Sequence, residues 1–131
     1  MTSDYGIRKD PSGSYDEVLA ALPEALKAEG FGILTEIDMQ STLKAKLGVD
    51  FRRYRILGAC NPPFAHRALS AELEVGLMLP CNVIVYEGDD GKAVVTAIDP
   101  TRTIAAAGIP ALAEVAETVK EKLGRALASL E

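Results

Sequence analysis

The chain has no tryptophan, and aromatic residues make up only 5% of its 131 residues. The core is therefore expected to be aliphatic, built from Leu, Val, Ile and Ala. Cysteine is also scarce, because two residues cannot form the disulfide framework that stabilises many small secreted proteins. No N-terminal stretch combines the positive start, apolar centre and cleavage site of a signal peptide. We therefore expect a cytoplasmic protein with both thiols reduced.

The sequence also lacks an excess of positive charge and any long apolar run. Acidic residues outnumber basic residues by 19 to 14, so the formal net charge is -5. This balance argues against nucleic acid as a partner, because its phosphates attract basic surfaces. The apolar runs are far shorter than the roughly 20 residues that span a bilayer, so no membrane partner is expected. A hydrophobic content of 48% instead predicts one globular domain spanning residues 1–131.

Strand and helix signals follow one another along the chain. Strands are expected at residues 5–9, 31–37, 51–59, 81–87 and 92–98, and helices at 14–30 and 39–47, over about ten residues from 62, and at 110–130. Ser14 and Glu17 form a capping-box pair at the start of the first helix, whereas Pro23 is expected to kink or divide it. Asp38 and Gly48 are suitable ends for the second helix.

These elements do not alternate strictly as strand, helix and strand. Gly88 to Gly91 separate two strands by a short loop, which predicts an antiparallel hairpin. We therefore expect the α+β class, with a single largely antiparallel β-sheet and α-helices packed on one face.

The side chains best suited to chemistry lie between Cys60 and Asn82. This stretch contains both cysteines, each followed by an asparagine, and the only histidine, His66. Cys60 ends one expected strand and Cys81 begins the next, and a helix that starts at Asn61-Pro62 lies between them. If the two strands are antiparallel neighbours, both thiols and both Asn side chains lie close together at one end of the sheet.

Three interpretations of this stretch are open. In the first, the cysteines are structural, since buried thiols pack as small hydrophobes. In the second, Cys60, His66 and Cys81 form a Cys2His site for zinc or another transition metal. In the third, Cys60 is a catalytic or redox thiol whose pKa is lowered by the start of the following helix. An anion would then bind at that helix start, near Arg55 and Arg67.

Two blocks of sequence carry a resemblance to a known family. The first contains Gly-Ala-Cys-Asn-Pro at residues 58–62, and the second contains Leu-Pro-Cys-Asn-Val at residues 79–83. With these motifs, and with Asp99-Pro100 after the last strand, the chain resembles the prokaryotic family catalogued as domain of unknown function 302 over nearly its whole length. The resemblance implies a compact α+β domain with an antiparallel sheet, and a homodimer. It implies no particular reaction.

These features predict a small soluble protein that forms a homodimer and binds a small ligand, an anion or a metal beside the two Cys-Asn motifs. The expected ligand-binding residues are Cys60, Asn61, His66, Cys81, Asn82, Arg55 and Arg67. One alternative is a thiol-dependent or redox enzyme that uses Cys60. The other is a structural or interaction module whose buried cysteines have no chemical role.

Overall fold

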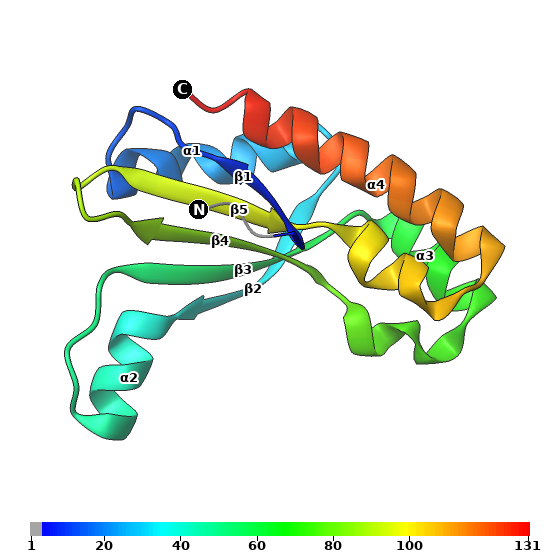
Figure 1. Cartoon of the computed structure of the whole chain (residues 1–131), viewed down its shortest axis with the longest axis horizontal. Coiled ribbons are helices and arrows are strands. Elements are labelled where there is room, and N and C mark those ends of the chain that lie inside the picture. Colours follow the sequence, from blue (N-terminus) through cyan, green and yellow to red (C-terminus); the bar gives the residue numbers. More distant parts are fainter. Residues whose placement is uncertain (1–3) are drawn as a thin grey trace.

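The computed structural model describes residues 4–131, and its strands form one five-stranded antiparallel sheet (Figure 1). The strands are β1 (Gly6–Lys9), β2 (Gly32–Asp38), β3 (Tyr54–Cys60), β4 (Cys81–Glu87) and β5 (Ala93–Ile98). They lie in the order β1-β5-β4-β3-β2. The predicted α+β class is therefore confirmed. Residues 1–3, the beginning of the polar N-terminal segment, lie outside the described residues.

Helices connect the strands. The α-helices are α1 (Tyr15–Lys27), α2 (Met39–Leu47), α3 (Pro62–Ala71) and α4 (Pro110–Ala128), and the 3-10 helices are η1 (Leu73–Met78), η2 (Pro100–Arg102) and η3 (Ile104–Ala107). Within residues 4–131, no helix has both the length and the apolar composition needed to cross a membrane.

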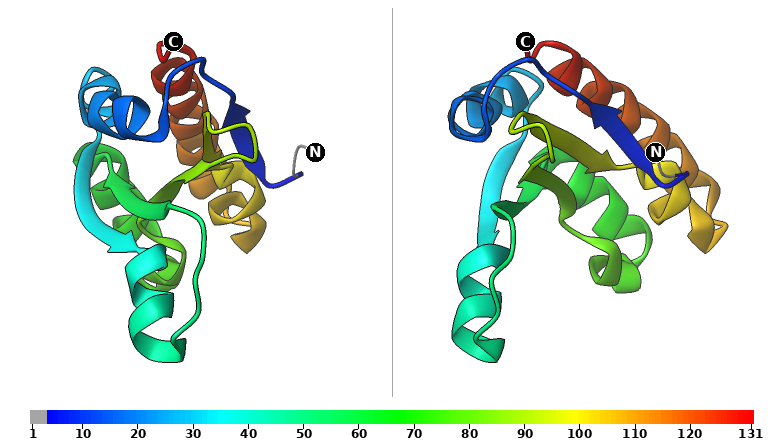
Figure 2. Two further views of the ribbon diagram at one scale, coloured as in Figure 1. Left: turned by 90° about the vertical axis from the view of Figure 1, so that its left-hand side faces the viewer. Right: turned by 60° about the vertical axis from the view of Figure 1, so that its left-hand side comes forward.

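The helices differ in how they pack on the sheet. Figures 1 and 2 show α1 and α4 side by side over one face, with α3 packed beside α4. The prediction of helices on one face holds for this group. By contrast, α2 extends away from the sheet at the end of β2, and its contacts are with β2 and β3.

Local sequence explains most helix boundaries. Ser14 and Glu17 form the predicted capping box at the start of α1. Asp38 caps α2, and Gly48 ends it in the left-handed conformation, at a φ of 67°. Pro23 was expected to kink or divide α1, and the helix is not divided, since one helix runs through this residue. Pro23 is exposed, so its ring lies on the solvent side of the helix.

The core lies between the sheet and the helices α1 and α4, and it is largely aliphatic, as the composition predicted. Its largest fully buried side chains include Leu22 and Leu26 of α1, Leu57 of β3, Val83 of β4 and Leu123 of α4. Burial of each such side chain contributes about 1.5–3 kcal/mol. This core holds β3 and β4 together, and with them the two cysteine-bearing ends.

Candidate functional site

The antiparallel pairing of β3 with β4 brings the two Cys-Asn motifs to the same end of the sheet. Ala59 is paired with Cys81, and Gly58 with Asn82. Cys60 therefore comes directly after Ala59, the residue that pairs with Cys81. The helices α3 and η1 lead the chain from one strand to the other. The predicted convergence of the two thiols is thus correct at the level of the backbone.

A pocket of about 280 Å³ lies at this end of the sheet, and both cysteines line it. Its walls come from β2 and the residue before it, from the ends of β3 and β4, and from α3, η1, η3 and α4. The apolar lining includes Phe31, Phe64, Leu69, Ile104, Val115 and Val119. Several of these residues belong to the buried core, so the pocket reaches from the surface into the interior.

Asn61 supplies the polar group of this wall. Among the described residues that line the pocket, it is the only one whose side chain contains nitrogen or oxygen. Its side chain makes no capping hydrogen bond at the start of α3. Instead Nδ2 donates to the backbone carbonyl of Glu29 at 3.1 Å. That bond fixes the orientation of the amide, and Oδ1 accepts no hydrogen bond from residues 4–131.

The two thiols are protonated at neutral pH. Burial raises the pKa of Cys60, which is half-buried. Burial, and secondarily the neighbouring Cys60, raises the pKa of Cys81 to about 11. The predicted lowering of the Cys60 pKa is therefore wrong. Pro62 and Pro63 open α3 without backbone N–H groups, so this helix start has few donors to stabilise a thiolate or a bound anion.

The predicted metal set is not assembled. Within the part of the chain that the structure describes, no three His, Cys, Asp or Glu residues are grouped so that they could hold a metal ion. Cys60 and Cys81 line the pocket, but His66 does not, and it is exposed on α3.

Two other predicted site residues also lie elsewhere. Arg55 is an ion-pair partner of Glu36 and Asp38, towards the opposite end of β3. Asn82 is exposed and does not line the pocket, although Cys81 beside it does. Of the seven predicted binding residues, the structure therefore places Cys60, Asn61 and Cys81 in one wall.

Comparison with known proteins agrees with this architecture. The family model described as "Domain of unknown function DUF302" matches residues 7–130. The chain belongs to the DUF302 family. It is similar to an uncharacterized conserved DUF302 protein from Bacillus stearothermophilus, whose crystal structure superposes with a TM-score of 0.90. The two are 33% identical, and the match covers 98% of this chain and 100% of that one. No curated protein is a significant match.

Positive charge gathers beside the pocket of this DUF302 protein. The guanidinium carbon of Arg67, on α3, lies 5.1 Å from the centre of the Phe64 ring. The Nζ atom of Lys122, on α4, lies 5.9 Å from the same centre. Phe64 lines the pocket, so α3 and α4 each place one cation beside this residue of the pocket wall. Arg67 was predicted as a site residue, whereas Lys122 was not.

Sequence reasoning also missed the apolar lining of the DUF302 pocket. Two of the three phenylalanines, Phe31 and Phe64, line it. In a chain with few aromatic residues, the position of Phe64 four residues after Cys60 was a usable signal. The contributions of η3 and α4 had no such signal, because Ile104, Val115 and Val119 lie more than 40 residues after Cys60 in the sequence.

Proposed function

We propose that this DUF302 protein binds a small, largely apolar molecule in the pocket beside Cys60 and Cys81. The observation that carries the proposal is the pocket itself, which reaches into the core with Asn61 as its single polar amide. An apolar cavity of about 150 Å³ is enough to hold a benzene molecule. At about 280 Å³, this pocket has room for a larger apolar group. Ligand sites are typically concave and mostly apolar, with few polar groups.

The state of the thiols favours binding over thiol catalysis. A nucleophilic cysteine needs a thiolate, which basic neighbours or a helix start usually stabilise. Burial raises the pKa of both Cys60 and Cys81 instead. In the proposed function, their sulfur atoms are part of an apolar wall that contacts the ligand.

A pocket-filling variant tests the proposal. Ala65 lines the pocket on α3, so Ala65→Trp should occupy the space, while Ala113→Trp adds the same side chain at an exposed position of α4. Octan-1-ol should raise the melting temperature of the wild type and of Ala113→Trp, but not of Ala65→Trp. Circular dichroism checks that each variant is folded.

Chemical shifts give a second measurement in the unchanged protein. Titration with octan-1-ol should move the methyl signals of Ile104, Val115 and Val119, which line the pocket, more than those of Leu47 on α2. Absence of any octan-1-ol effect on the wild type would overturn the proposal. So would an equal effect on the two tryptophan variants.

We propose in addition that the protein is a homodimer in which α2 contacts the second copy. The observation in favour is that α2 contains no buried residue. A helix of nine residues is too short to be stable by itself in water, since isolated helices below about 12–15 residues are marginal. Exposed apolar side chains on α2 and the segments that flank it form an α2 surface, made of Ile37, Leu47, Val49 and Phe51.

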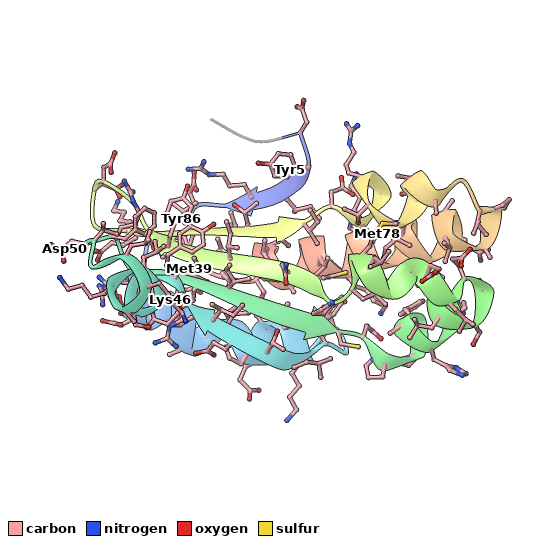
Figure 3. All side chains as sticks on the ribbon, turned by 90° about the horizontal axis from the view of Figure 1, so that it is seen from below. Tyr5, Met39, Lys46, Asp50, Met78 and Tyr86 are labelled. Atoms are coloured by element: carbon pink, nitrogen blue, oxygen red, sulfur yellow. The ribbon has the colours of Figure 1, made fainter. Side chains whose placement is uncertain are left out.

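The molar mass in solution tests the dimer. Light scattering should give twice the chain mass of 13.9 kDa for the wild type. The double variant Leu47→Glu/Phe51→Glu places charge on the α2 surface and should give the monomer mass. Leu73→Glu is the matched control, because Leu73 is 84% exposed on η1. Figure 3 shows Met78 of η1 at the other end of the sheet from Met39 and Lys46 of α2. A monomeric wild type would contradict the proposal.

A further inference from the structure

We infer that the ligand of the pocket is a small organic anion, with an apolar body inside the pocket and a carboxylate at Arg67 and Lys122. The inference rests on the function proposed above and names the class of ligand. Three properties of the described residues support it: the convergence of two cations on Phe64, their lack of acidic partners, and the absence of a positively charged residue from the pocket lining.

The two cations share one aromatic ring although they come from different helices. Arg67 lies 5.1 Å and Lys122 lies 5.9 Å from the ring centre of Phe64. The helices that carry them, α3 and α4, pack against each other. Phe64 is half-buried and lines the pocket; Arg67 and Lys122 do not line it, but both charges lie next to this residue of its wall.

Neither cation has an acidic partner among residues 4–131. Other basic residues of α4 do: Lys120 pairs with Asp99 at 3.1 Å, and Arg125 pairs with Glu29 at 3.1 Å. No ion pair within the described chain involves Arg67 or Lys122. In a protein with a net charge of -5, two such cations at one ring form a local site of positive charge.

The interior of the pocket determines how such a ligand is oriented. A carboxylate needs hydrogen-bond donors, because an unpaired buried charge is strongly unfavourable. Asn61 uses one of its two Nδ2 hydrogens on the carbonyl of Glu29, its Oδ1 would repel the anion, and no described residue that lines the pocket carries a positive charge. The apolar body therefore lies inside, and the carboxylate lies at the rim beside Arg67 and Lys122.

The volume gives the size of the apolar body. At the ~30 Å³ that a water molecule occupies in the liquid, 280 Å³ corresponds to roughly nine non-hydrogen atoms. Octanoate is a suitable probe, because its alkyl chain matches this space and its carboxylate reaches the rim. Octan-1-ol and octylamine have the same alkyl chain with a neutral and a cationic head.

Calorimetric titration with these three probes tests the inference. The wild type should bind octanoate more tightly than octan-1-ol, and octylamine most weakly. A surface charge pair changes affinity by a factor of roughly two to five, so Arg67→Gln/Lys122→Gln should weaken octanoate binding about tenfold. Binding of octan-1-ol should be unchanged in that variant. High ionic strength should reduce the preference of the wild type for octanoate, because salt screens exposed charges.

A second double variant controls for net charge. Lys27→Gln/Lys46→Gln removes two exposed positive charges from α1 and α2, and should leave octanoate affinity unchanged. Equal weakening in both double variants would overturn the inference. Equal affinity of the wild type for octanoate and octan-1-ol would also overturn it, while leaving the proposed apolar pocket intact. Failure of all three probes to bind would instead refute the proposed function.

Discussion

Gly58 shows how a single residue holds the cysteine end of the sheet in place. It lies in β3, across from Asn82 of β4, and has no room for a side chain. A Cβ atom at this position would overlap Oγ1 of Thr35 and would lie 2.7 Å from Cγ of Pro80. The ring of Pro80 also lines the pocket, so a glycine here lets the pocket wall approach the strand.

Replacement of Gly58 by alanine should therefore destabilise the protein. Overpacking of a tight site typically costs about 1–3 kcal/mol, and we expect Gly58→Ala to lower the free energy of unfolding by that amount in urea titrations. Gly32→Ala is the matched control, since among the described residues nothing lies within 4 Å of a Cβ at Gly32 in β2. It should be neutral or slightly stabilising, because alanine loses less backbone entropy in a strand. Equal destabilisation by the two changes would contradict the steric explanation.

At the same scale, Asn61 shows what the sequence could and could not predict. Its position as the residue before α3 follows from the Asn-Pro pair and was predicted correctly. The hydrogen-bond partner of its side chain is the carbonyl of Glu29, which is 32 residues away along the chain. A local pattern has no information on such a contact. The raised pKa of Cys60 is a similar case, because its burial depends on tertiary packing.

At the scale of elements, local chemistry predicted most of the boundaries. The capping box of α1, the Asp38 cap and Gly48 end of α2, and the loop between β4 and β5 each depend on residues close together in sequence. Pro23 does not divide α1, because the effect of a proline depends on which side of the helix it occupies. The ring of Pro23 lies on the solvent side of α1.

The helix α2 shows that a helix can form at the predicted residues without burying any side chain. Its end signals are strong, so the sequence predicted its bounds correctly. Its lack of buried residues could not be predicted from those signals, because caps specify where a helix ends and not what it packs against. The other three α-helices described each bury at least one side chain in the core. This difference is the physical reason for proposing a second copy as the partner of α2.

At the scale of the whole molecule, the sheet combines predictable and unpredictable pairings. The hairpin of β4 and β5 follows from a short loop, but β1 pairs with β5 across about 90 residues of chain. The pocket arises at the same scale, where α3, η3 and α4 meet the ends of β3 and β4. The sequence indicated the right end of the sheet through its cysteines. It did not indicate the apolar pocket that these cysteines line, because the pocket exists only in the assembled fold.

The pKa of Cys81 depends on the burial of its thiol in this core. Cys81 is 6% exposed, and burial, followed by the nearby Cys60, raises its pKa from an ordinary value of 9.0 to about 11. Below pH 9 the thiol is protonated in the folded and unfolded states, so its stabilising contribution is fully present. As the pH rises from 9 to about 11, the unfolded thiol ionises first. This group therefore stabilises the fold less and less across that interval.

Urea unfolding at a series of pH values measures this contribution. Between pH 8 and pH 11, the wild type should lose about 2–3 kcal/mol more of its unfolding free energy than Cys81→Ala, since two pKa units correspond to that energy. Tyr15 and Tyr54, whose pKa values burial also raises, are present in both proteins and cancel in the comparison. Parallel curves for the two proteins would contradict the burial of Cys81.

The rate of alkylation gives the complementary kinetic measurement. With iodoacetamide at pH 8, Cys81 should react far more slowly than a model thiol, because the core must open before the reagent reaches it. Cys60 is half-buried and should react at an intermediate rate, and in urea both should reach the rate of the model thiol. Fast alkylation of Cys60 in the folded protein would indicate a thiolate and restore the thiol-enzyme alternative. Slow alkylation of both would instead support their role as walls of an apolar binding pocket.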